Sequence, residues 1–252
     1  MKVEAPQTFV TRQECDKIAF QNGFRLTHGE TDGWRHYTST TAQGSIWLAA
    51  MQTGNWLLSI DHAGVLAEID LEISDVDGPG LACFRFKSLT SLYAAMSGLY
   101  ELAVSLPDAP LQEFLLRTKG MPRTTEVERL VVQRVGQSIF RDRLMTYWKV
   151  RCPMTGITDP DLLRASHIKP WRDCKTDAER LDVHNGLLLS ALWDAAFDKG
   201  HVSFEEEGTP IFSTKLSAEA RTHLKGENSK IQGLTDEHKL QLAWHRKNLF
   251  DH

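Results

Sequence analysis

The apolar residues among the first 106 positions follow two patterns, one typical of helices and one typical of strands. Residues 11–14, Thr-Arg-Gln-Glu, form a capping-box pattern before an apolar run, which predicts a helix from about residue 12 to 22. Segments rich in β-branched and aromatic residues, separated by Gly-containing turns, predict an antiparallel meander with strands over 34–40, 45–51, 55–61 and 65–73, to which 81–86 can add a fifth. Helical spacing returns over residues 88–106 and predicts a second helix.

A third helical stripe follows two proline-containing breaks, at residues 107–110 and 119–122. It predicts a helix over 124–147 whose apolar face consists of Val127, Leu130, Val131, Val135, Ile139, Phe140 and Leu144. We therefore predict a domain boundary near residue 120. Residues 1–120 form an α+β domain, in which helices cover one face of an antiparallel sheet, and residues 121–252 form a second domain.

The second domain contains a predicted strand–loop–strand–helix unit. Residues 162–168 have strand character, which Lys169-Pro170 ends, and a charged loop over 173–182 leads to a return strand over 187–189. Ser190 is a suitable N-cap for a helix that ends at Lys199, with Gly200 at the C′ position. Asp194 and Asp198 lie four residues apart on that helix, so both carboxylates can approach one cation.

Composition places the chain among ordinary globular proteins, since 41% of its 252 residues are hydrophobic and 25% are charged. The amino terminus lacks the apolar stretch of a signal peptide, and no apolar run is long enough to cross a bilayer. We expect a cytoplasmic protein without a membrane partner. The four cysteines form no C-x-x-C pair, so we expect reduced, mostly buried thiols and neither a disulfide scaffold nor a zinc ribbon.

Charge is distributed unevenly although the net charge is only −4. Residues 1–119 contain 9 Lys and Arg against 14 Asp and Glu, whereas residues 117–151 contain nine basic residues against three acidic ones. The basic stretch could contact phosphates or could be a solvated helix face. The acidic balance of the first domain argues against a nonspecific electrostatic grip on DNA.

Three motifs of the second domain resemble those of the HNH endonucleases, whose active site is the ββα-metal motif. They are Ser166-His-Ile-Lys-Pro-Trp171, Asn185-Gly-Leu-Leu-Leu-Ser190 and Trp193-Asp-Ala-Ala-Phe-Asp-Lys-Gly200. The subgroup with these motifs usually occupies the carboxyl end of bacterial restriction-type proteins, and Arg151-Cys-Pro-Met-Thr-Gly156 and Leu242-Ala-Trp-His-Arg246 also fit it. The resemblance covers about residues 125–252 and leaves the first domain unassigned.

The resemblance implies a role for each motif residue. His167 would be the general base, because histidine titrates near neutral pH. Asn185 would hold the loop that orients His167, and in some relatives this asparagine reaches the metal. Asp194 and Asp198 fill two ligand slots. Two carboxylates without a nearby cysteine favour Mg²⁺ or Mn²⁺ over Zn²⁺. Many relatives have an Asp or His metal ligand where this chain has Ser166, so the coordination sphere stays open.

The resemblance therefore implies a metal-dependent DNA endonuclease of restriction type. Because cutting both strands usually takes two such sites, we expect a homodimer. The candidates for contacts to DNA phosphates are Arg164, Lys169, Arg172, His245 and Arg246.

Two other functions and one further role stay open. The chain could be a catalytically inactive HNH-fold DNA-binding module, or a toxin-like nonspecific nuclease whose first domain binds an inhibitor or a delivery partner. In a modification-dependent enzyme the first domain could instead hold a flipped or modified base. The aromatic residues for that pocket, which could equally be core, are Trp34, Tyr37, Trp47 and Trp56.

Overall fold

The computed structural model describes residues 3–224 and 228–251 and divides into two compact units, Met1–Ala109 and Pro110–His252. The architecture is mixed, with an antiparallel sheet in the N-terminal unit, as the sequence predicts. Within the described residues, no helix combines the length and the apolar character that crossing a bilayer requires. All four cysteines are buried free thiols, which confirms that prediction.

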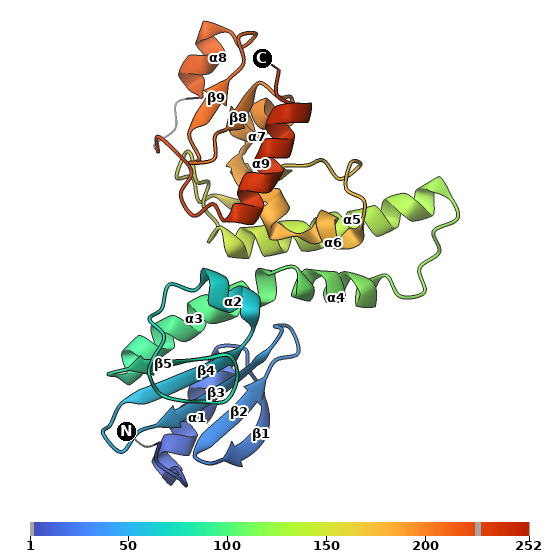
Figure 1. The fold of residues 1–252 in the computed structure, drawn as a ribbon. Coiled ribbons are helices and arrows are strands. Elements are labelled where there is room, and N and C mark those ends of the chain that lie inside the picture. The colour runs from blue at the N-terminus through green and yellow to red at the C-terminus, as the bar shows by residue number, and fades with distance from the viewer. Residues whose placement is uncertain (1–2, 225–227, 252) are drawn as a thin grey trace. The chain divides into compact units, whose positions relative to one another are not determined.

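The N-terminal unit is built on a five-stranded antiparallel meander in the order β1-β2-β3-β4-β5 (Figure 1). Its strands are β1 (Leu26–Thr31), β2 (Trp34–Thr38), β3 (Ser45–Ala50), β4 (Trp56–Asp61) and β5 (Ala82–Phe86). Strand β1 was not predicted, because nearly all of its side chains are exposed and no buried face produces an alternating pattern. The turn between β1 and β2 places Asp32 and Gly33 at positive φ, the conformation of a two-residue type I′ hairpin.

Two helices, α1 (Phe9–Gln21) and α3 (Leu89–Ser105), pack on one face of this sheet. That face includes Tyr37, Ile46 and Ile60, which lie opposite one another in the strand register. The cap of α1 differs from the prediction, since the Thr8 side chain, and not that of Thr11, accepts the first-turn amide.

The predicted strand over 65–73 is wrong, because α2 (Ala63–Glu68) occupies the first part of that range. His62 caps α2 by accepting the amide of Val65. Six residues are too few to show a 3.6-residue period, so the β-branched and leucine side chains suggested a strand.

The boundary between the two units lies within α4 (Asp108–Arg117), and α5 (Glu126–Tyr147) follows in the C-terminal unit. The sequence did not predict α4 because of its proline, but Pro110 lies in the first turn, where a missing amide costs no hydrogen bond. A capping box of Thr125 and Glu128 starts α5 near the predicted position. Only the second half of its predicted apolar face is buried, and Val127, Leu130 and Val131 are exposed.

The ββα unit is present as predicted, with β6 (Leu163–His167) antiparallel to β7 (Gly186–Ser190) and α7 (Ala191–Asp198) directly after β7. Gly200 takes positive φ behind α7, as expected of a C′ glycine. Between the strands lie α6 (Asp177–Leu181) and the short helix η2 (Val183–Asn185), and η1 (Pro160–Leu162) precedes β6. The remaining elements are β8 (Val202–Phe204), β9 (Pro210–Phe212), α8 (Ala218–His223) and α9 (Asp236–Asn248).

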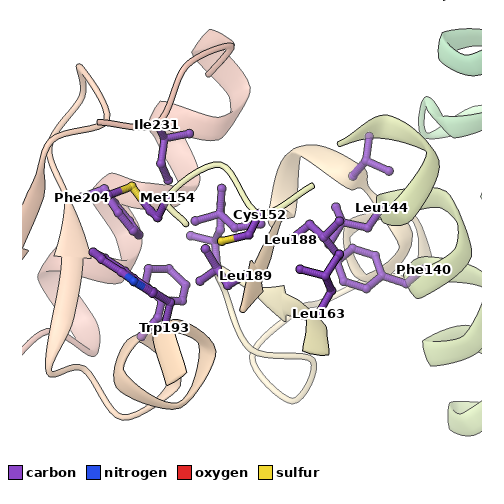
Figure 2. Close-up of a cluster of buried hydrophobic side chains, with 14 of the residues drawn as sticks. Phe140, Leu144, Cys152, Met154, Leu163, Leu188, Leu189, Trp193, Phe204 and Ile231 are labelled. Atoms are coloured by element: carbon purple, nitrogen blue, oxygen red, sulfur yellow. The ribbon is translucent and has the colours of Figure 1, made fainter. Parts of the chain in front are cut away.

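One hydrophobic core joins these elements. Phe140 and Leu144 of α5 reach Leu163 and Leu188 of the two strands, and Trp193 of α7 continues the core towards β8, where its ring stacks on Phe204 (Figure 2). Both strands therefore pack against α5 and α7, and β7 continues directly into α7. This packing fixes the positions from which the side chains of the site project.

Candidate active site

Residues from β6 and α7 line a cavity of about 250 Å³ in the C-terminal unit. The structure brings together three of the predicted site residues, His167, Asp194 and Asp198, at this cavity, whereas Asn185 does not line it. The lining residues are Ala165, Ser166, His167, Pro170, Trp171, Asp194 and Asp198.

His167 is fixed by one hydrogen bond and two aromatic contacts. Its Nε2 lies 2.9 Å from the carbonyl oxygen of Arg180, which can only accept, so Nε2 carries the proton and Nδ1 keeps the free lone pair. The ring stacks on Phe140 at 3.8 Å between centroids and meets Trp171 edge-on. Burial lowers the pKa of His167 to about 4, against the smaller opposing effect of the Arg180 carbonyl. This value lies below the near-neutral pKa expected from the residue type, so the imidazole is neutral at neutral pH but is a weaker base than a free histidine.

Asn185 is completely buried and holds the loop that follows β6. Its Oδ1 accepts the amide of Lys169 at 2.8 Å, and its Nδ2 donates to the carbonyls of Lys169 at 3.1 Å and Glu179 at 3.2 Å. These bonds agree with the expected role in orienting the loop. They place the amide away from the cavity, so the geometry offers no position for Asn185 as a metal ligand.

Two residues of the same loop were not identified from the sequence. The Glu179 carboxylate accepts from Lys169 Nζ at 2.5 Å and from the Lys175 amide at 2.6 Å. Arg180 donates to the carbonyls of Trp171 and Cys174, and its own carbonyl accepts from His167. The signal available was Thr176-x-x-Glu179, a Ser/Thr-x-x-Glu start of a helix within the predicted loop.

Asp194 faces the cavity beside Ser166, whose hydroxyl donates to Asp194 Oδ1 at 2.5 Å. Burial raises the pKa of Asp194, as does the negative charge of Asp198, while the Ser166 hydrogen bond and the positive charge of Arg164 lower it. Asp198 is far more accessible, with 62% of its side chain exposed, and it pairs with Lys199 at 3.0 Å. A cation beside Asp194 would relieve the repulsion from Asp198 that disfavours the ionised form of Asp194.

The donor set fits a hard divalent cation with open coordination positions. Among residues 3–224 and 228–251, no three His, Cys, Asp or Glu side chains gather as a complete metal site. A Zn²⁺ site would need three or four protein ligands, whereas Mg²⁺ is commonly held by one or two carboxylates plus water and substrate phosphate. Asp194 and Asp198 meet the second requirement, and the Ser166 hydroxyl adds another oxygen beside them.

The five predicted phosphate contacts separate into two groups. His245 is wrong as a surface contact: it is fully buried, bonded to Ser203 and Phe197 and stacked on Phe197. Arg246 donates to the Phe204 carbonyl, and Lys169 is committed to Glu179, so both serve the fold. Arg164 and Arg172 are exposed and stay candidates for contact with DNA.

Much of the predicted basic stretch is also used internally. Arg117 and Arg143 both pair with Glu113, which joins α4 to α5. Arg141 donates to the carbonyls of Leu163 and Pro160 and fixes the start of β6 against α5. The excess of positive charge in this stretch is therefore smaller at the surface than in the sequence.

Comparison with known families agrees with this geometry. The sequence model of the HNH endonuclease family matches residues 152–205, a segment that contains β6, β7 and α7 together with His167, Asn185, Asp194 and Asp198. The C-terminal unit thus carries an HNH endonuclease domain, of a family that generally uses divalent metal ions. No curated protein matches the chain.

Proposed function

We propose that the protein is a metal-dependent DNA endonuclease of restriction type, with His167 as the general base. The observation that carries this proposal is the anchored, neutral imidazole of His167 in one cavity with Asp194 and Asp198. A base whose proton acceptor is free at neutral pH, beside carboxylates suited to a hard cation, is what hydrolysis of a phosphodiester requires.

Each residue then has a defined task. His167 Nδ1 takes a proton from the attacking water, while the Nε2–H bond to Arg180 maintains the required tautomer. Asp194 and Asp198 would hold Mg²⁺ or Mn²⁺, which when bound polarises the scissile phosphate and stabilises charge on the leaving oxygen. Ser166 fixes the direction of the Asp194 carboxylate, and Asn185 fixes the loop that carries the Arg180 carbonyl.

A plasmid nicking assay with Mg²⁺ or Mn²⁺ tests the proposal. The change His167→Ala should reduce the rate at least about 100-fold, because general base catalysis contributes that much or more. His223→Ala, which removes an exposed imidazole on α8, is the matched control and should leave the rate unchanged. Equal nicking by both variants and the wild type would contradict the assignment of His167.

The same assay separates the enzyme from an inactive DNA-binding module. That second function is favoured by one observation, namely that Ser166 stands where many relatives supply a metal ligand, which leaves two carboxylates at the site. Retained DNA affinity without nicking by the wild type, in either metal, would support the module and exclude the enzyme.

We also infer that the enzyme acts as a homodimer and depends on base modification. The dimer is supported by exposed apolar residues on α4 and α5 (Leu115, Leu116, Val127, Leu130 and Val131). Sedimentation should show a dimer for the wild type and a monomer for Leu130→Glu. A monomeric wild type would contradict the inference.

Digestion of methylated, hydroxymethylated and unmodified DNA tests the modification dependence. Equal cutting of all three DNA forms would exclude it.

A further inference from the structure

A second cavity, of about 400 Å³, lies in the N-terminal unit on the sheet face opposite to α1 and α3. It has the size of a small-ligand site. Its lining combines indole and imidazole rings with two carboxylates from separate loops. The lining residues are His28, Thr31, Asp32, Trp34, His36, Trp47, Asp77, Gly78 and Pro79.

The aromatic walls of this cavity are held in place. Trp34 is 7% exposed and packs in a cluster with Ala49, Leu57 and Cys83. Trp47 stacks on His36 with the rings 4.7 Å apart and 13° from parallel. These rings offer flat surfaces of fixed orientation, on which a planar group can stack without a large loss of side-chain entropy.

The backbone of residues 77–80 lies directly against both indoles. A Cβ atom at Gly78 would stand 3.0 Å from the Trp34 ring, and one at Gly80 would stand 3.0 Å from the Trp47 ring and 2.5 Å from the Ile60 carbonyl oxygen. Gly80 also has positive φ. The loop can close on the two tryptophans only because these residues are glycines, and this contact shapes the cavity.

Two carboxylates give the cavity strong hydrogen-bond acceptors. Asp32 comes from the β1–β2 turn and Asp77 from the loop before β5, and neither forms an ion pair with a residue that the structure describes. The Nε2 atom of His36 is buried and has no partner within the described residues. The lining includes no Lys or Arg, so a phosphate group is disfavoured while a neutral group with N–H donors is favoured.

We propose that this cavity binds an extruded cytosine or adenine and recognises it through its exocyclic amino group. This inference rests on the proposed function, since DNA is the source of the base. The base would stack on the tryptophan and histidine rings, and its amino group would donate to Asp77, as carboxylates accept from cytosine N4. Thymine has no amino group and could offer a carboxylate only its ring N3–H, which lies elsewhere on the base edge.

Binding of three duplexes to the full chain carrying His167→Ala tests the proposal without interference from cleavage. The duplexes share one sequence and carry a central cytosine, adenine or thymine opposite an abasic site, which lowers the cost of extrusion. We expect fluorescence anisotropy to give a Kd for the cytosine or the adenine duplex about fivefold or more below that for thymine. Asp77→Asn and Trp47→Ala should each remove the preference.

Two matched controls accompany these variants. Asp75→Asn neutralises a carboxylate of the same loop that pairs with Arg85, and Trp56→Ala removes a tryptophan of β4 that alternates onto the opposite face of the sheet. Both should keep the preference. Asp77 is exposed, so its substitution tests the cavity even if Trp47→Ala disturbs folding.

Equal Kd values for the three bases, or a preference that persists in Asp77→Asn, would overturn the proposal. A third result would also overturn it: the protein binds tetramethylammonium, this binding needs Asp77, and no base is preferred. The cavity would then be an aromatic cage for a cation. Plasmid nicking by the wild type is a separate result. If the wild type nicks DNA but shows no base preference, only this inference is wrong. If the wild type does not nick DNA but shows the base preference, only the proposed nuclease activity is wrong.

Discussion

Ser166 is next to both the histidine and the aspartate of the candidate site. It precedes His167 in β6, and its hydroxyl donates to the Asp194 carboxylate. The sequence shows that this position has neither a carboxylate nor an imidazole, but it does not show that the serine hydroxyl bonds to the Asp194 carboxylate. This bond compensates in part for burial, which is the largest cause of the raised pKa of Asp194.

The change Ser166→Asp should therefore strengthen metal binding, because it adds a third carboxylate to the set. A tenfold gain in Mn²⁺ affinity is about 1.4 kcal/mol and would enlarge the rise in Tm on adding Mn²⁺ by roughly 3 °C. Without metal the variant should melt below the wild type, because three like charges repel. Ser138→Asp, which adds the same charge at an exposed position of α5, is the control. An unchanged response to Mn²⁺ would show that the cation is not held beside Ser166.

At the scale of elements, the segment between β6 and β7 decides how the base is held. The sequence predicts the two strands, the following helix and its Gly200 end, because their apolar residues and caps are local signals. It does not predict α6 or the bond from His167 to the Arg180 carbonyl, because a backbone acceptor 13 residues away leaves no trace in residue type. For the same reason His245 resembled a surface contact, although it is buried against Phe197.

Asn185 and Asp198 should separate stability from chemistry. Asn185→Ala removes the acceptor of the Lys169 amide and one donor each from the Lys169 and Glu179 carbonyls, so we expect a loss of about 2–4 kcal/mol in the free energy of unfolding. Asp198→Ala alters an exposed side chain and should change the free energy of unfolding by less than about 0.5 kcal/mol. Both should reduce nicking, and urea unfolding measures the difference. A stable Asn185→Ala protein would remove the asparagine from its role in holding the loop.

At the scale of the whole molecule, buried neutral histidines make stability depend on pH. His238 and His245 are fully buried, and burial lowers the pKa of His238 to about 3 and of His245 to about 4 from an ordinary 6.5. Between pH 6 and 4.5 the unfolded chain binds protons at these residues and the folded chain does not. Stability is therefore complete above pH 6.5 and falls on acidification by about 1.4 kcal/mol per pH unit for each histidine.

Urea unfolding of the wild type and of His245→Gln between pH 7 and 4.5 measures this dependence. Glutamine cannot titrate, so the variant should lose less stability per pH unit than the wild type, even if it is less stable throughout. Parallel curves would show that His245 is protonated in the folded protein and that its burial against Phe197 does not control its charge.

The two compact units allow a division of labour in which the C-terminal unit cuts and the N-terminal unit selects. The core of the HNH domain draws its residues from Phe114 of α4 onwards, so a fragment of residues 108–252 keeps that core and the whole of α4. We expect this fragment to fold and to nick plasmid DNA with the same dependence on His167 as the full chain. It should lose any preference among methylated, hydroxymethylated and unmodified DNA, because the cavity beside Trp34 and Trp47 is absent. Circular dichroism measures the folding of the fragment, and digestion of the three DNA forms measures its preference.

If the full chain also cuts all three DNA forms equally, the N-terminal unit does not select the substrate, and a toxin-like nuclease explains the chain better. If instead the fragment keeps the preference, selection resides in the HNH domain itself, where the exposed Arg164 and Arg172 are the first residues to test.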